Sequence, residues 1–295
     1  MILNPTLVKV LKTLLKLVVS SLALVFVFNK IDLPALWALL RKCHVFLLFL
    51  AGICFILSKV ISAYRLNYFF RSVAIHITEV ANLKLYWLGM FYNLFLPGGI
   101  GGDGYKVYFL HKKLNSPVKK SILATVFDRL SGLLALVLLW LFFALFIPEK
   151  PIPSLYLLII SGFGILLFYG IVYRWFNLFY QTLHATNLLA FGTQLSQVIS
   201  AFLILKALGN EAHTFEYLFV FLLSSVVAVI PFTIGGIGAR EVAFLYASNY
   251  LHLDTSLSIA LSLLFFFITA LVSLTGIIYV YRPGTIHILK NQTAE

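Results

Sequence analysis

Long apolar runs without charged residues follow one another along this chain and predict its architecture. About 20 consecutive apolar residues in a helix cross the hydrocarbon core of a bilayer, and runs of this order recur. The pattern predicts an all-α integral membrane protein with about six full spans. We place these spans near residues 10–28, 44–64, 121–147, 153–173, 186–205 and 255–281.

Two further apolar segments, at about 83–110 and 217–251, are interrupted by clusters of proline and glycine. Proline removes a backbone hydrogen-bond donor, and glycine weakens a helix. Each segment is therefore predicted to be a broken, re-entrant helical hairpin that enters and leaves the membrane on one side. The residues of the two breaks are Pro97, Gly98, Gly99, Gly101 and Gly102, and then Pro231, Gly235, Gly236 and Gly238.

The two breaks also align with each other. When Pro97 is set on Pro231, "PGGIGGDGYK" lies over "PFTIGGIGAR" with five of ten positions identical, and Lys106 meets Arg240. We therefore expect a single membrane domain, residues 1–295, that consists of two repeats at about 1–148 and 149–295. Because each repeat has an odd number of full spans, the second begins on the opposite side of the membrane, and the repeats are inverted. In transporters of this kind, paired breaks mark a central site.

Composition agrees with a membrane protein, since 61% of the 295 residues are hydrophobic and only 11% are charged, against about 25% charged in soluble domains. The net charge is +12, from 22 basic and 10 acidic residues. Cytoplasmic loops and anionic lipid account for this excess without nucleic acid. The bases predict a cell inner or plasma membrane location with both termini cytoplasmic, although residues 30–42, with three bases and one acid, are an exception. The bases counted as cytoplasmic are Lys9, Lys12, Lys16, Lys59, Arg65, Arg71, Lys112, Lys113, Lys119, Lys120, Arg174, Arg282 and Lys290.

Six charged residues lie beside the breaks or inside a span. A charge within the membrane costs about 2.5–3.5 kcal/mol on insertion scales, so each is a candidate for function. Neighbouring helix positions do not face each other. We therefore expect Asp128 to pair with Arg240, and Arg129 with Asp103 or Glu241, in a network that is either static or part of transport. The six candidates are Asp103, Lys106, Asp128, Arg129, Arg240 and Glu241.

Lys106 and Arg240 follow the breaks, beside backbone N–H groups at expected helix starts. A cation in this setting suits an anion such as a headgroup phosphate. An alternative is that these side chains extend to the membrane interface, which fits Lys106 better than Arg240. The seven histidines and the cysteines, Cys43 and Cys54, show no metal-ligand spacing, so neither metal nor cofactor is expected.

Three motifs, in this order, resemble the lysylphosphatidylglycerol synthase transmembrane domain family, also called flippase-like. They are "NLFLPGGIGGDGYKVYFL" (93–110), "TVFDRLSGLLAL" (125–136) and "PFTIGGIGAREVAFLY" (231–246). The family forms the membrane part of the multiple peptide resistance factor. The resemblance implies translocation of an anionic phospholipid or a lipid-linked glycan between leaflets, without nucleotide hydrolysis by the chain. It also places the six charged candidates on the family's polar motif positions.

This sequence departs from the family in three respects. The family often has arginine where Lys106 stands and glutamate where Asp128 stands, and both differences keep the charge but change reach or geometry. The cytoplasmic aminoacyl-transferase domain of the resistance factor has no counterpart here, so no enzyme activity is expected.

Two other functions remain open. The chain could be a scaffold whose basic loop, residues 111–120, docks a cytoplasmic or membrane glycosyltransferase or lipid synthase. It could instead be an enzyme that acts on a polyprenyl-linked sugar, with Asp103, Asp128 and Glu241 as acid or base. The expected partners are membrane lipids with anionic headgroups, whereas nucleic acid is not expected.

Overall fold

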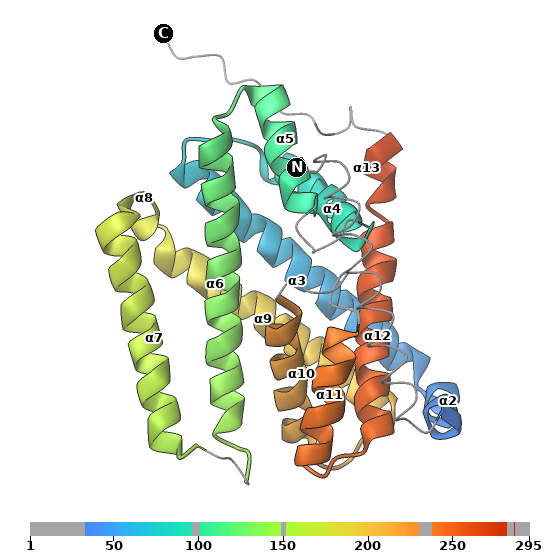
Figure 1. Ribbon diagram of the computed structural model, residues 1–295. Coiled ribbons are helices and arrows are strands. Elements are labelled where there is room, and N and C mark those ends of the chain that lie inside the picture. The colour runs from blue at the N-terminus through green and yellow to red at the C-terminus, as the bar shows by residue number, and fades with distance from the viewer. Residues whose placement is uncertain (1–32, 96–100, 149–151, 230–237, 282–285, 287–295) are drawn as a thin grey trace, which may run out of the picture.

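The computed structural model describes residues 33–95, 101–148, 152–229, 238–281 and 286, and every regular element in this part of the chain is a helix (Figure 1). The predicted all-α fold is thus confirmed. Five helical segments are long and apolar enough to cross a membrane, and the expected span at 10–28 lies outside the described residues. The five are Val45–Ser72, Val118–Ala144, Ser154–Trp175, Leu183–Ala207 and Thr255–Tyr281.

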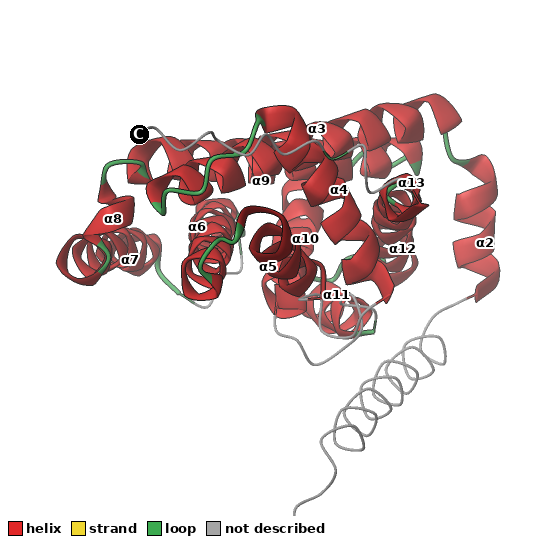
Figure 2. Ribbon diagram, turned by 90° about the horizontal axis from the view of Figure 1, so that it is seen from above, coloured by secondary structure: helices red, strands yellow, loops and turns green. Residues whose placement is uncertain are grey.

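Helices α3 (Val45–Ser72) and α9 (Leu183–Ala207) form the most extensive helix pair and lie together along one face of the molecule (Figure 2). Small polar residues join them: the Ser200 hydroxyl donates to the Ala51 carbonyl at 2.9 Å, and the hydroxyls of Ser62 and Thr193 are 3.3 Å apart. Small residues let membrane helices approach closely. The pair therefore forms an oblique layer on which α4, α6, α10 and α12 pack.

Three other helices are closer to vertical than this layer in Figure 1. They are α6 (Val118–Ala144), α7 (Ser154–Trp175) and α12 (Thr255–Leu274), and α6 and α12 run in opposite directions. The short α8 (Asn177–Tyr180) connects α7 to α9. The expected span at 255–281 consists of α12 and α13 (Ile277–Tyr281), separated by Thr275 and Gly276.

Helices end on both sides of each predicted break. The first pair is α4 (Glu79–Phe95) with α5 (Gly101–Leu114), and the second is α10 (Thr214–Val229) with α11 (Ala239–Tyr250). The members of each pair pack together, and the two pairs lie toward opposite ends of the molecule (Figure 1). Of the break residues, Gly101 and Gly102 begin α5 and Gly238 precedes α11. The others, Pro97, Gly98, Gly99, Pro231, Gly235 and Gly236, lie outside the described residues.

The structure adds one helix and corrects one boundary. Within residues 30–42, which were predicted to lie on the external side of the membrane, Leu33–Lys42 forms helix α2, which packs against α12. The span expected to end at residue 64 continues to Ser72, because Leu66, Phe69 and Phe70 extend its apolar buried stripe. Arg65, which was counted as a cytoplasmic base, is therefore inside a helix and only 5% exposed.

The apolar core consists of two main clusters that meet different parts of α3. Phe55 belongs to the cluster that contains Phe221 and Phe265 from α10 and α12. Phe69 belongs to the cluster that contains Phe127 and Phe179. Along α3, the buried residues between these two phenylalanines are mainly polar, and they include Ser58, Ser62 and Arg65. The polar part of the molecule thus begins in the middle of its longest helix.

Candidate functional site

A buried ion pair connects the oblique layer to the upright helices. Arg65 on α3 donates from Nε to Oδ1 of Asp128 on α6 at 2.7 Å. Asp128 is 7% exposed, so both charges are removed from the membrane lipid. Gly132, one turn further along α6, lies under the guanidinium, since a Cβ added there would be 3.2 Å from both Nη atoms. The small residue provides the room that the arginine needs.

A second ionic group centres on Asp103 in the first turn of α5. Its Oδ1 accepts from Lys106 Nζ at 3.0 Å, and its Oδ2 accepts from Arg129 Nε at 2.5 Å. Asp103 and Lys106 are buried, whereas 41% of the Arg129 side chain is exposed. Because Asp128 and Arg129 are adjacent on α6, this helix carries one partner of each ionic group. Helices α3, α5 and α6 are thereby joined through charged side chains.

Lys106 occupies a tight space between the two helices of the first pair. Its Nζ lies 4.3 Å from the centre of the Tyr86 ring, and a Cβ at Gly89 would be 2.6 Å from Lys106 Cε. A Cβ at Gly102 would overlap the backbone carbonyl of Gly89. Both glycines are therefore required by the close approach of α4 and α5. Lys106 is buried in this contact and does not extend to the interface.

Asn93, near the end of α4, binds the start of α5. Its Oδ1 accepts a hydrogen bond from the backbone N–H of Gly102 at 2.8 Å. The first N–H groups of a helix have no partner within that helix, so this side chain satisfies one of them. The asparagine stands four residues before Pro97, but its spacing alone gave no sign of this contact.

The second pair holds its charges differently. Glu241 accepts from the Gly238 N–H at 2.7 Å through Oε2 and from the Ser262 hydroxyl at 2.8 Å through Oε1. Gly238 has a φ of 85°, which favours glycine, and this conformation directs its N–H to the carboxylate. Arg240 donates from Nη2 to Ser225 at 3.0 Å. Its guanidinium also lies 5.1 Å from the centre of the Phe265 ring.

The expected pairing was partly right. Arg129 does pair with Asp103, one of the two partners expected for it. The expected pair of Asp128 with Arg240 is wrong, because Arg65 fills that position. Arg65 was missed because the predicted span ended at residue 64, one position before it, whereas α3 continues to Ser72. The signal was a stripe of Ser58, Ser62, Arg65 and Phe69, whose helical spacing places them on one face.

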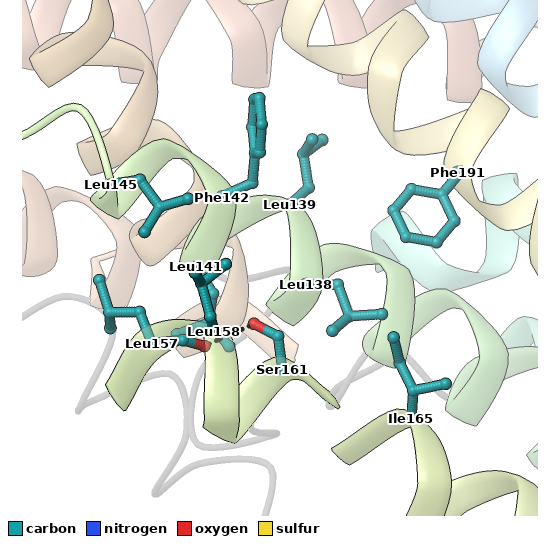
Figure 3. Close-up of a pocket in the computed structure, with 10 residues that line it drawn as sticks. All are labelled: Leu138, Leu139, Leu141, Phe142, Leu145, Leu157, Leu158, Ser161, Ile165 and Phe191. Atoms are coloured by element: carbon teal, nitrogen blue, oxygen red, sulfur yellow. Dashed lines mark hydrogen bonds between the residues drawn. The ribbon is translucent and has the colours of Figure 1, made fainter. Parts of the chain in front are cut away.

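An apolar groove lies apart from these charges, between α6, α7 and α9 (Figure 3). It has a volume of about 410 Å³ and is lined by leucine, phenylalanine and isoleucine side chains together with Ser161. A neighbouring hollow of about 120 Å³ reaches Tyr169 and Asn187. Asn187 donates to the Tyr169 hydroxyl at 3.2 Å and accepts from Ser131 at 2.8 Å. These hydrogen bonds connect α7 through α9 to α6, next to an apolar groove that suits hydrocarbon chains.

Together these features define a polytopic helical membrane protein with charged residues buried among its spanning helices. The family model described as "Lysylphosphatidylglycerol synthase TM region" matches residues 13–188 and 178–276. These matches cover most of the chain, which belongs to this family, and the resemblance noted in its three motifs is confirmed. No curated protein and no solved structure matches the chain. The family assignment and the apolar helices establish a multi-pass membrane protein related to flippase-like proteins.

Proposed function

We propose that this protein moves an anionic phospholipid, or a lipid-linked glycan with an anionic headgroup, between the two leaflets. The observation that carries this proposal is the set of charged side chains from α3, α5, α6 and α11 that are buried or partly buried in the helix bundle, together with the exposed Arg129 at its edge. It contains five bases and three acids, and its surplus of positive charge suits an anion. The bases are Lys59, Arg65, Lys106, Arg129 and Arg240, and the acids are Asp103, Asp128 and Glu241.

The route follows from the cost of charge in hydrocarbon. A charged group at the centre of a bilayer costs several kcal/mol, and fixed polar groups along the path lower this barrier. The headgroup would pass along these charged side chains while its acyl chains remain in lipid or against the apolar groove. No chemical step by the chain is part of this proposal, and neither is a metal or a cofactor.

We further infer that the two halves are inverted repeats. The order of a long helix, a short helix pair and a long helix occurs at α3–α6 and again at α9–α12. The helices α3 and α9, like α6 and α12, run in opposite directions (Figure 1). Such repeats support alternating access, in which each short pair opens one side of a shared site. The proposed orientation has both termini and the basic residues 111–120 in the cytoplasm.

The direct test is leaflet exchange in proteoliposomes that contain a trace of fluorescent phosphatidylglycerol. Dithionite quenches only the outer leaflet, so quenching beyond that of protein-free vesicles measures exchange. We expect exchange with the natural sequence and with Arg174→Ala, a control at the exposed end of α7. We expect none with Arg240→Ala or with Asp128→Asn, which keeps an acceptor for Arg65 but removes the negative charge. Absence of exchange with the natural sequence, or normal exchange in both variants, would overturn the proposal.

A second candidate is docking of a glycosyltransferase or lipid synthase at the cytoplasmic end. The observation that favours it is the group of exposed lysines at the end of α5 and the start of α6: Lys112, Lys113, Lys119 and Lys120. Copurification of such an enzyme, lost on changing these lysines to alanine and accompanied by no leaflet exchange, would favour docking over transport.

A further inference from the structure

Lys59 is a cation in the middle of α3 that the sequence placed among cytoplasmic bases. The structure puts it well inside the span, where its Nζ lies 4.6 Å from the centre of the Phe55 ring. Among the described residues, no carboxylate lies within ion-pair distance of this ammonium group. An aromatic face attracts a cation but does not neutralise it. The positive charge of Lys59 is therefore not compensated by any described carboxylate.

Arg240 on α11 has the same character. Its guanidinium lies against the rings of Phe221 and Phe265, and Nη2 donates to Ser225. Its Nε is buried and has no hydrogen-bond partner in the part of the chain that the structure describes. Among the described residues, Arg240 has no carboxylate within ion-pair distance. The adjacent Glu241 instead accepts from the Gly238 N–H and from the Ser262 hydroxyl. A buried charged donor without a partner is costly and rare, and indicates that a group binds there.

The two cations belong to one place in the fold. The Phe55 ring under Lys59 and the Phe265 ring under Arg240 meet edge to face, with centres 5.6 Å apart. Arg65, on the same helix as Lys59, has a buried Nη1 that finds no hydrogen-bond partner among the described residues. Each half of the chain thus places one cation against this pair of phenylalanine rings, Lys59 from α3 and Arg240 from α11. An anion bound here would balance the two positive charges.

We propose that Lys59 and Arg240 bind the phosphodiester of an anionic lipid headgroup, with Arg65 at the edge of the site. This inference deepens the proposed function, on which its choice of ligand rests. A phosphodiester has two oxygens that can accept from an ammonium and a guanidinium at once. Lys106 contrasts with Lys59 and Arg240, because Asp103 already neutralises it at 3.0 Å, as Asp128 does Arg65 at 2.7 Å. The first helix pair is therefore closed by its own charges, and the headgroup site lies between α3 and the second helix pair.

The test measures binding to the detergent-purified full chain by calorimetry, with dihexanoyl phosphatidylglycerol as the probe. Lys59→Met and Arg240→Gln each remove a charge; methionine keeps most of the length of lysine, and glutamine keeps a polar group although it is shorter than arginine. The matched control is Lys206→Met, because Lys206 is also a lysine on a spanning helix above a phenylalanine, but it donates to the Asn210 carbonyl at 3.0 Å. We expect each site variant to weaken binding at least tenfold and the control to stay within twofold of the natural sequence. Unchanged binding in both site variants would overturn the site.

Inorganic phosphate and dihexanoyl phosphatidylcholine separate the possible ligands. We expect both to bind more weakly than phosphatidylglycerol, because the first lacks the lipid part and the second carries a compensating positive charge. Inorganic phosphate that binds more tightly than the lipid would overturn the headgroup assignment.

Thermal unfolding without lipid distinguishes a binding role from a structural one. Removing an uncompensated charge should leave the midpoint of Lys59→Met at or above that of the natural sequence, and added phosphatidylglycerol should raise the midpoint only where the site is intact. A lower midpoint with unchanged lipid stabilisation would mean that Lys59 is structural and would overturn the site. Binding without leaflet exchange would overturn the proposed function and leave the site standing. Leaflet exchange that is preserved in both Lys59→Met and Arg240→Gln would overturn the site and leave the proposed function standing.

Discussion

Arg65 and Asp128 form a buried ion pair at 2.7 Å although 63 positions separate them in the sequence. This pair joins α3 to α6. The hydrogen bond from Arg129 on α6 to Asp103 joins α5 to the same helix. Two charges removed from lipid stabilise a fold chiefly when both are present, because either one alone is left uncompensated. The packing of α3 against α6 therefore depends on both Arg65 and Asp128.

Loss of one member should be strongly destabilising. We expect Asp128→Ala to lower the free energy of unfolding by about 3–5 kcal/mol, since Arg65 would remain buried without its counter-charge. Chemical unfolding in detergent measures this change. Arg71→Ala is the control: the Arg71–Glu79 pair is at the surface, and loss of such a pair costs about 0–1 kcal/mol. The double variant Arg65→Met with Asp128→Leu should be more stable than Asp128→Ala, and equal destabilisation by the two would contradict the assignment.

The packing of α4 against α5 can be tested with two glycines on the same helix. Gly102→Ala should destabilise the protein and weaken the contact between α4 and α5, because the new Cβ would overlap the Gly89 carbonyl. Gly104→Ala has open space and should be neutral or stabilising, by up to about 1 kcal/mol from helix propensity. Thermal midpoints of the two variants give the comparison. Similar midpoints would show that the helices are not in close contact at Gly102.

The start of α11 depends on the conformation of Gly238. Its φ of 85° is one that other residues adopt only with strain, so Gly238→Ala should cost about 1–3 kcal/mol. The N–H bond to Glu241 should weaken at the same time. Gly170→Ala on α7, where nothing lies within 4 Å of a new Cβ, is the control for a change of glycine as such. Equal unfolding free energies for the two variants would argue against the strained conformation.

The orientation of the chain can be tested with single cysteines in a variant that lacks Cys43 and Cys54. Lys113 and Glu211 are both exposed. Lys113 lies in the last turn of α5 and Glu211 between α9 and α10, and these two segments lie at opposite ends of the helix bundle (Figure 1). If the termini are cytoplasmic, a membrane-impermeant maleimide added to intact cells should label Glu211→Cys and leave Lys113→Cys unlabelled. Labelling of both should follow once the membrane is permeabilised. The reverse pattern in intact cells would invert the proposed topology.

Hydrophobic runs located the described spans because span length is set by the thickness of hydrocarbon. The predicted breaks at Pro97 and Pro231 lie outside the described residues and stay predictions. The pairing of charges is not local. Arg65 resembles a loop base when only hydropathy is considered, and its partner on α6 follows from the packing of α3, which periodicity does not report. The contact of Asp103 with Arg129 was predictable because only a few acids lie near the membrane segments. The contact of Asn93 with Gly102 was not, since it depends on the angle between α4 and α5.

The position of Lys59 near the middle of α3 has an electrical consequence for the proposed transport, because an anion bound there lies part of the way across the membrane voltage. An anionic headgroup that crosses the whole bilayer carries its charge through the full potential, at about 2.3 kcal/mol per 100 mV. The resting voltage would then bias in which leaflet an anionic lipid accumulates, without any fuel consumed by the protein.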